Sequence, residues 1–156
     1  MSGVPFSVDE YVRWSDVDHA GIIFYGVYVR FFEIAETEMF RAAGLPYGTF
    51  FERLGIWLPR AHFDCDFHHP ARLDDRLRVV PYVSAFGRTS LTLRFDVWHL
   101  VTGRVAATAH EVLVCTDRTS LAPIPIPGAL RDALAPFVFS ERAAREALVP
   151  GAGTHA

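Results

Sequence analysis

The spacing of apolar positions changes along the chain and predicts a strand, then a long helix, then a run of strands. Residues 6–14 alternate between apolar and polar side chains with a noisy period of two, which is typical of a strand. From 26 to 43 the apolar positions recur every three to four residues, which predicts a helix. Gly44 and Pro46 are good stop signals for that helix, and residues 47–53 predict a short second helix.

The second half of the chain predicts mainly antiparallel strands. The strands are expected at 56–68, 76–85, 91–100 and 105–116, followed by a helical turn at 129–134. Pro81 cannot donate a backbone hydrogen bond, so its strand should have a bulge or an edge there.

This order of elements favours an α+β fold in one domain. The long helix carries apolar side chains almost all around its surface, because Tyr28, Val29, Phe32 and Phe40 widen its apolar face. Such a helix should be buried on most sides, which requires a curved antiparallel sheet wrapped around it. We expect the domain to cover 1–139 and the tail, 140–156, to fray or to form a short helix.

Composition and charge exclude several classes of function. The chain is 51% hydrophobic and carries a net charge of −3 with no long basic run, so a nucleic-acid partner is not expected. There is no signal peptide and no apolar run long enough to cross a bilayer, which predicts a cytoplasmic protein without membrane insertion. Cys65 and Cys115 are interpreted as small core residues. The chain contains no Lys, so an anionic ligand would be held by the guanidinium groups of Arg, by His or by backbone N–H groups.

Several separated motifs carry a family resemblance. The segment 14–25 reads WSDVDHAGIIFY and is followed by YVRFFE at 28–33 and TEM at 37–39. Further motifs are PARLDD at 70–75, TSL at 89–91 and EVLVC at 111–115. Together they resemble the 4-hydroxybenzoyl-CoA thioesterase family, and within it the YbgC-type acyl-CoA thioesterases of the Tol-Pal gene cluster, in the family's order.

The resemblance implies a hot-dog fold, in which an antiparallel sheet curls around one long helix. It implies paired subunits with active sites at their interface, as a homodimer or homotetramer. It assigns Asp18 as the catalytic carboxylate and the backbone N–H of Tyr25 as the group that polarises the thioester carbonyl. The sequence departs from the family at His19, at the Tyr25 side chain and at the pair His68–His69.

The residues themselves support the same chemistry. Thioester hydrolysis needs a carboxylate that attacks or activates water, and a donor aimed at the developing oxyanion. Asp18 lies just before the predicted helix, whose N-terminus offers free N–H groups, while Gly21 and Gly26 let the backbone approach a ligand closely. The competing interpretation is that Asp18 only shapes a turn. Asp16 is interpreted as structural, orienting the loop.

Other candidate residues have weaker support. His19, His68 and Phe24 are candidates to line an acyl pocket, and Arg88 is a candidate for a CoA phosphate, although each also has an ordinary structural explanation. His19, His68 and His69 lack the spacing of zinc enzymes, so no metal and no cofactor is predicted.

The predicted function is hydrolysis of acyl-CoA thioesters. Acyl carrier protein stays open as the thiol carrier, and the acyl group is not predicted. Two alternatives remain. One is a hot-dog dehydratase acting on hydroxyacyl chains, although the His-containing Phe-Pro motif expected for that chemistry is missing. The other is an acyl-CoA-binding module without turnover. The fold alone does not decide between hydrolysis, dehydration and binding without turnover.

Overall fold

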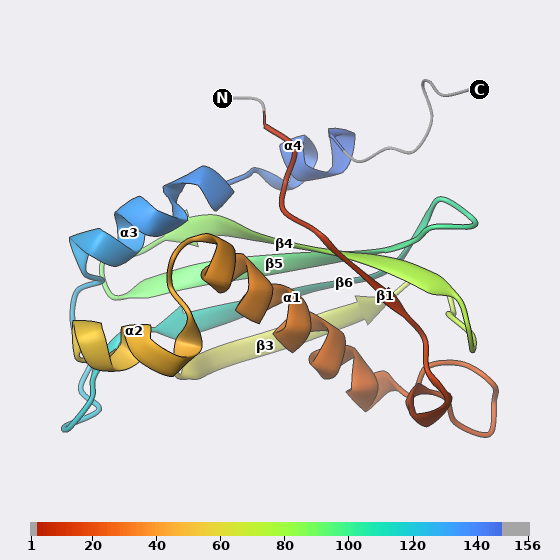
Figure 1. The fold of residues 1–156 in the computed structure, drawn as a ribbon, viewed down its shortest axis with the longest axis horizontal. Helices are drawn as coiled ribbons and strands as arrows, with labels where there is room; N and C mark the ends of the chain where they lie inside the picture. Colours follow the sequence, from red (N-terminus) through yellow and green to blue (C-terminus); the bar gives the residue numbers. More distant parts are fainter. Residues whose placement is uncertain (1–2, 148–156) are drawn as a thin grey trace.

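The fold is a five-stranded antiparallel sheet with one long helix lying across one of its faces (Figure 1). The structure, a computed structural model, describes residues 3–147. The strand order is β1-β4-β5-β6-β3, and a small second sheet pairs β2 with β7. The strands are β1 (Val8–Tyr11), β2 (Ile56–Trp57), β3 (Arg60–Phe67), β4 (Arg76–Phe86), β5 (Ser90–His99), β6 (Arg104–Val114) and β7 (Thr116–Asp117).

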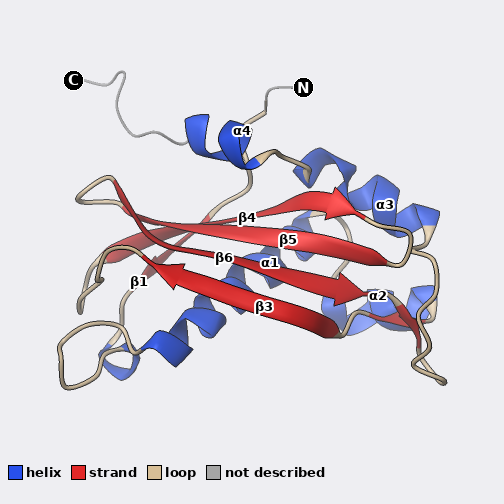
Figure 2. Cartoon of the chain, turned by 180° about the vertical axis from the view of Figure 1, so that it is seen from behind, coloured by secondary structure: helices blue, strands red, loops and turns tan. Residues whose placement is uncertain are grey.

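Within the described residues four α-helices accompany the sheet, and the longest packs against its inner face. They are α1 (Tyr28–Ala42), α2 (Tyr47–Leu54), α3 (Gly128–Leu134) and α4 (Glu141–Glu146). Seen from behind, the sheet covers α1, while α3 and α4 lie along the side of β4 (Figure 2). The expected α+β hot-dog architecture is therefore confirmed.

The buried side of α1 forms the core together with the inward side chains of the strands. Phe31, Ala35, Met39 and Phe40 are fully buried, and Leu93 on β5 belongs to the same core cluster. Because β-strand side chains alternate between faces, every second residue of β5 points at the helix. The single chain does not bury α1 on all sides, because Val29 is 51% exposed and the side of the helix that carries it faces solvent.

Two predicted strands are shorter or more divided than the pattern indicated. The strand expected at 6–14 ends at Tyr11, because the chain then turns into a short 3₁₀ helix, Trp14–Asp16. The strand expected at 56–68 is two strands, since the chain changes sheets at Pro59: Trp57 pairs with Thr116 of β7, whereas Arg60 pairs with Leu113 of β6.

Pro81 occupies the local edge that its chemistry requires. On one side β4 pairs with β5 along its length, with Pro81 opposite Phe95. On the other side β1 pairs with β4 only from Arg76 to Val79. The missing N–H of Pro81 therefore breaks no ladder with β1, and the predicted edge is confirmed.

The outer face of the sheet is partly covered by α4. Val80, Tyr82 and Trp98 form a second apolar cluster with Ala144 of that helix. Arg145 of α4 approaches the buried carboxylate of Asp96 at 3.4 Å. The short helix expected in the tail is therefore present as α4, and the rest of the tail lies outside the described residues.

The two cysteines are separate thiols in apolar surroundings, as expected. Cys115 is buried and Cys65 is half-buried, and neither forms a disulfide. Burial raises the pKa of Cys65 to about 11, so its thiol stays protonated at neutral pH. In the described part of the chain, no helix combines the length and apolarity needed to cross a membrane.

Candidate active site

Asp18 lies in a tight turn between β1 and α1. Val17 and Ile23 form an isolated antiparallel bridge, which brings the two arms of the loop together. The Gly21 N–H donates to the Asp18 carbonyl at 2.9 Å, and the Asp18 N–H donates to Ile22 at 3.1 Å. Gly21 has a φ of 75°, a conformation that glycine adopts without strain.

The carboxylate of Asp18 is exposed and only partly engaged. One oxygen, Oδ1, accepts a hydrogen bond from the Ala20 N–H at 2.8 Å, which fixes the side-chain direction. Among residues 3–147, no arginine or histidine forms an ion pair with this carboxylate. Its second oxygen is available for a water molecule or a substrate.

Asp16 has the opposite environment, because it is 2% exposed and fully occupied. Its Oδ2 accepts from the Arg13 N–H at 2.7 Å, and its Oδ1 accepts from the Arg30 guanidinium at 2.6 Å. Arg30 belongs to α1, so this pair ties the loop to the helix. The geometry supports the structural role inferred for Asp16.

The start of the central helix presents free backbone donors beside this loop. A 3₁₀ helix, Tyr25–Val27, precedes α1, and its first hydrogen bond runs from the Val27 N–H to Phe24. The N–H groups of Tyr25 and Gly26 come before that bond and find no acceptor in the described chain. A Cβ atom at Gly26 would lie 3.2 Å from the Phe24 ring, so a larger residue here would crowd that ring beside the free N–H groups.

Two surface hollows meet at Asp18. The larger, of about 720 Å³, is lined by Trp14, Val17, Asp18, His19, Ala20 and Phe24. The second, of about 480 Å³, is lined by Asp18, Ile22, Ile23, Tyr25, Tyr28, Phe67, His68, His69, Pro70 and Ala71. Burial raises the pKa of Tyr28 to about 12, so its phenol stays neutral. The carboxylate thus stands where two hollows join, both of them lined mainly by apolar side chains.

Most of the site residues expected from the sequence come together around Asp18. His19 and Phe24 line the first hollow, Tyr25 and His68 line the second, and Gly21 shapes the turn between them. His68 also shares a hydrogen bond of 2.8 Å with Thr108.

Arg88 is not brought to this site within one chain. It lies in the hairpin between β4 and β5, where its carbonyl accepts from the Ile126 N–H. The Asp18 loop follows Tyr11, which pairs with Arg76 at the other end of β4. At about 3.4 Å per residue, the length of β4 separates the two places. A role for Arg88 toward the same ligand would need a second subunit.

The sequence pattern did not single out all residues of the second hollow. Tyr28, Phe67 and His69 line it, yet their positions read equally well as helix or strand core. Phe67 is 53% exposed, and its ring lies 5.3 Å from that of Tyr28. The sequence signal that could have indicated this hollow is Phe67, an aromatic residue at the end of the predicted strand and just before His68 and His69.

A polar network lies further along α1, at Glu36, beyond the end of the helix that meets the loop. The Arg60 guanidinium contacts Glu36 of α1 and approaches Glu111 of β6 at 3.7 Å. The Tyr47 hydroxyl donates to Glu36 at 2.5 Å. Burial, together with the charge of Glu36, raises the pKa of Glu111 to about 7. Two carboxyl groups in this apolar setting therefore depend on a single cation.

The comparisons with known proteins agree with this fold. Residues 12–134 match the family model described as the thioesterase-like superfamily, so the chain belongs to that superfamily, a family of hot-dog enzymes. The chain is 25% identical over 122 residues to the 1,4-dihydroxy-2-naphthoyl-CoA hydrolase of Synechococcus elongatus, covering 78% of this chain and 88% of that protein. It is 26% identical over 121 residues to the acyl-CoA thioester hydrolase YbgC of Escherichia coli, covering 74% and 85%.

A solved structure shows the same fold at lower identity. The 1,4-dihydroxy-2-naphthoyl-CoA thioesterase Slr0204 from Synechocystis superposes with a TM-score of 0.76 at 21% sequence identity. The match covers 83% of this chain and 95% of that one. The family and the enzyme class expected from the sequence motifs are thereby confirmed.

Proposed function

We propose that the protein hydrolyses acyl-CoA thioesters, with Asp18 as the catalytic carboxylate. The observation that supports this most directly is the exposed, unpaired Asp18 carboxylate next to the free N–H groups of Tyr25 and Gly26. Relatives named as acyl-CoA hydrolases support the substrate class. A residue that only shaped a turn would have no need of free backbone donors beside it.

In the proposed reaction the thioester carbonyl oxygen accepts hydrogen bonds from the N–H groups at the start of α1. These donors and the positive end of the helix dipole stabilise negative charge as it develops on that oxygen. Asp18 either takes a proton from the attacking water or attacks the carbonyl carbon itself. The carbon–sulfur bond then breaks, and the thiolate of CoA leaves and takes a proton. Where Asp18 is the nucleophile, water then hydrolyses the anhydride between the acyl group and Asp18, which releases the free acid and restores the carboxylate.

The two hollows suggest how the substrate divides around Asp18. The second hollow is lined mainly by apolar and aromatic side chains, which suits the acyl group. His19 borders the first hollow and Arg72 lies close to Gly21, so polar parts of the substrate would leave the site on that side. Acyl carrier protein remains an alternative thiol carrier.

The substrate assay is a panel of aromatic, short-chain and long-chain acyl-CoAs, with released thiol read by a colour reagent. We expect turnover of at least one class. Tight binding of acyl-CoA without thiol release would instead indicate a binding module, and release of water from a hydroxyacyl thioester would indicate a dehydratase. The cytoplasmic location stays a prediction.

We further propose that the active protein is a dimer or a tetramer of paired subunits. The edge of β3 that faces away from β6 has no strand partner in the described residues, and open edges of this length are normally covered. Beside it lies an exposed apolar strip formed by Val29 of α1 with Phe63 and Phe67 of β3. Such strips mark interaction surfaces, and a self-complementary one favours a symmetric pair.

Placing a charged side chain in this apolar strip should separate the subunits. We expect Val29→Asp to shift the protein toward a single-chain mass in sedimentation, with loss of thioesterase activity. Val101→Asp is the matched control, because Val101 is 81% exposed in the turn between β5 and β6, away from β3. A wild-type protein that sediments as an active monomer would contradict the proposal.

Thioester hydrolysis should not depend on a metal ion. Asp18, His68 and His69 all line the second hollow, but within the described residues their ligand atoms do not come within 4.8 Å of one another as a group of three. We expect dialysis against a strong chelator to leave kcat unchanged. Activity that disappears and returns only with an added divalent ion would show that this expectation is wrong.

A further inference from the structure

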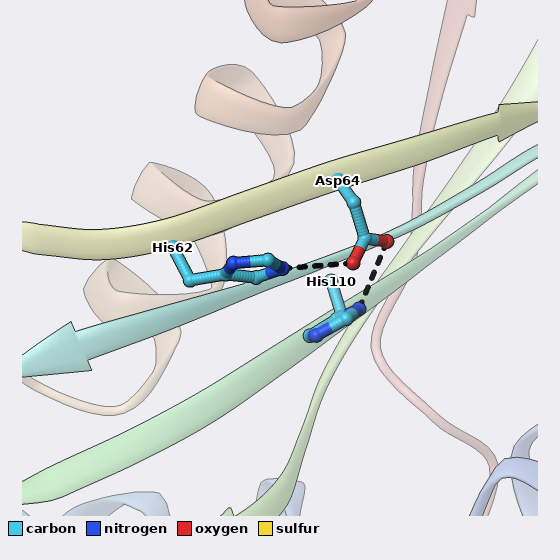
Figure 3. Close-up of side chains that lie close together, drawn as sticks. All are labelled: His62, Asp64 and His110. Carbon is cyan, nitrogen blue, oxygen red and sulfur yellow. Dashed lines mark hydrogen bonds and ion pairs between the residues drawn. The ribbon is translucent and has the colours of Figure 1, made fainter.

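Three metal-ligating side chains meet on the outer face of the sheet, away from the Asp18 loop (Figure 3). His62 Nε2 lies 2.9 Å from one oxygen of Asp64, and His110 Nδ1 lies 2.9 Å from the other. The ligand atoms of the three residues are all within 4.8 Å of one another. Neither the family motifs nor the proposed reaction uses any of these residues.

Strand register brings the three together. Asp64 of β3 pairs directly with His110 of β6, and His62 precedes Asp64 by two residues on the same strand. Side chains two apart share a face, so all three point outward. Phe63, between them, points inward and contacts Phe32 of α1. The cluster is therefore held by two hydrogen-bonded strands, which fix its backbone.

The chemistry and dimensions suit a divalent transition-metal ion. Imidazole nitrogen and carboxylate oxygen are both ligands of zinc, at about 2.0–2.2 Å. Those bond lengths place the ligand atoms of a tetrahedral site about 3.3–3.6 Å apart. The two histidine–carboxylate distances of 2.9 Å are slightly shorter than that range, so small side-chain rotations would open each pair enough to admit the ion.

The surroundings leave room for a further ligand and do not repel a cation. A hollow of about 300 Å³ adjoins the cluster and is lined also by Asp66, Arg94, Thr108 and Glu141. The one positive side chain among these, Arg94, approaches Glu141 of α4 at 3.5 Å.

We propose that His62, Asp64 and His110 form a binding site for a divalent transition-metal ion, zinc being the best match, with one position left to water. The bound ion links the edge strand β3 to β6. This site is separate from thioester hydrolysis, because the cluster lies on the outer face of β3, whereas Phe67, the β3 residue of the second hollow, points to the inner face. The same three groups without a metal would be two histidine–carboxylate hydrogen bonds, and the experiment must separate the two states.

The test is zinc binding to the full-length protein, measured by calorimetry, and cobalt binding, measured by visible absorption. We expect one ion per chain and a cobalt spectrum typical of nitrogen and oxygen ligands. His62→Ala and Asp64→Asn should each weaken binding by more than about 10–100-fold, the loss usual for a mere outer-shell partner. His19→Gln is the matched control, since His19 is exposed but outside the cluster, and it should bind as the wild type does.

Folding of each variant is checked by its thermal transition without metal, which should match the wild type because these side chains are on the surface. Zinc should raise that transition in the wild type and in His19→Gln only. No binding by the wild type in several-fold excess of zinc would overturn the proposal. Equal binding by the wild type and both cluster variants would place the ion elsewhere and overturn it as well.

Discussion

Replacing Asp18 by Asn is expected to reduce kcat for thioester hydrolysis by about 10²–10⁴-fold, the usual value of a positioned proton-transfer group. Loss of a nucleophile would cost more. The amide oxygen of Asn can still accept the Ala20 N–H, so the turn and the thermal transition should be unchanged. The donors of Tyr25 and Gly26 are backbone groups, so KM should change little.

Asp16→Asn is the matched control, two residues away in the same loop. It leaves Arg30 opposite a neutral amide in a buried position, which should lower stability by about 1–3 kcal/mol. Its kcat should fall far less than that of Asp18→Asn. If Asp16→Asn loses turnover while Asp18→Asn keeps it, the motif is misaligned by two residues. If both variants keep near-normal kcat, the proposed mechanism is wrong.

Replacing Arg60 by Met is expected to lower the free energy of unfolding by about 3 kcal/mol at pH 8, because it leaves two buried carboxylates without a cation. We take the lower end of the usual range since the Arg60 side chain is 38% exposed and water screens part of its charge. Glu36 and Glu111 are 3% and 7% exposed. Urea unfolding at a fixed protein concentration measures the effect.

The loss should depend on pH in a defined direction. The pKa of Glu111 is raised from 4.5 to about 7 in the folded protein, so the folded state holds this proton more tightly than the unfolded state. Stability linked to Glu111 is therefore greatest below about pH 4.5 and falls as pH rises to about 7. Removing Arg60 raises this pKa further, so the variant should lose much less stability at pH 5 than at pH 8.

Two further variants make the Arg60 result specific. Arg41→Met removes a surface arginine that pairs with Glu38 at 3.4 Å, and it should cost less than about 1 kcal/mol. Adding Glu111→Gln to Arg60→Met should recover part of the loss at pH 8. A loss that is equal at both pH values, or equal for Arg41→Met, would count against a charge-dependent network.

The parts of this structure that the sequence predicted are those governed by local pattern. The helix expected at 26–43 is found as α1 because its apolar period is a property of one segment. The division at Pro59 was missed because the residues on both sides suit a strand, and only pairing with different sheets separates them.

The remaining features depend on register between distant strands. Asp64 and His110 face each other because β3 pairs with β6 in one particular alignment, which no local pattern reveals. The metal set considered from the sequence and set aside for its spacing, His19, His68 and His69, contains none of these residues. Likewise Arg88 was chosen for its neighbouring Gly87, although the hairpin places it beyond the far end of β4.

The cover that α4 provides has a consequence for anyone who shortens this chain. The family match ends at 134, and a gene cut there would still encode every residue of the proposed active site. It would, however, uncover Tyr82 and Trp98 on the back of the sheet and strip Arg145 from the buried Asp96. Burial already raises the pKa of that carboxyl. The shortened protein would thus expose an apolar patch on the outer face of the sheet, and it would tend to aggregate.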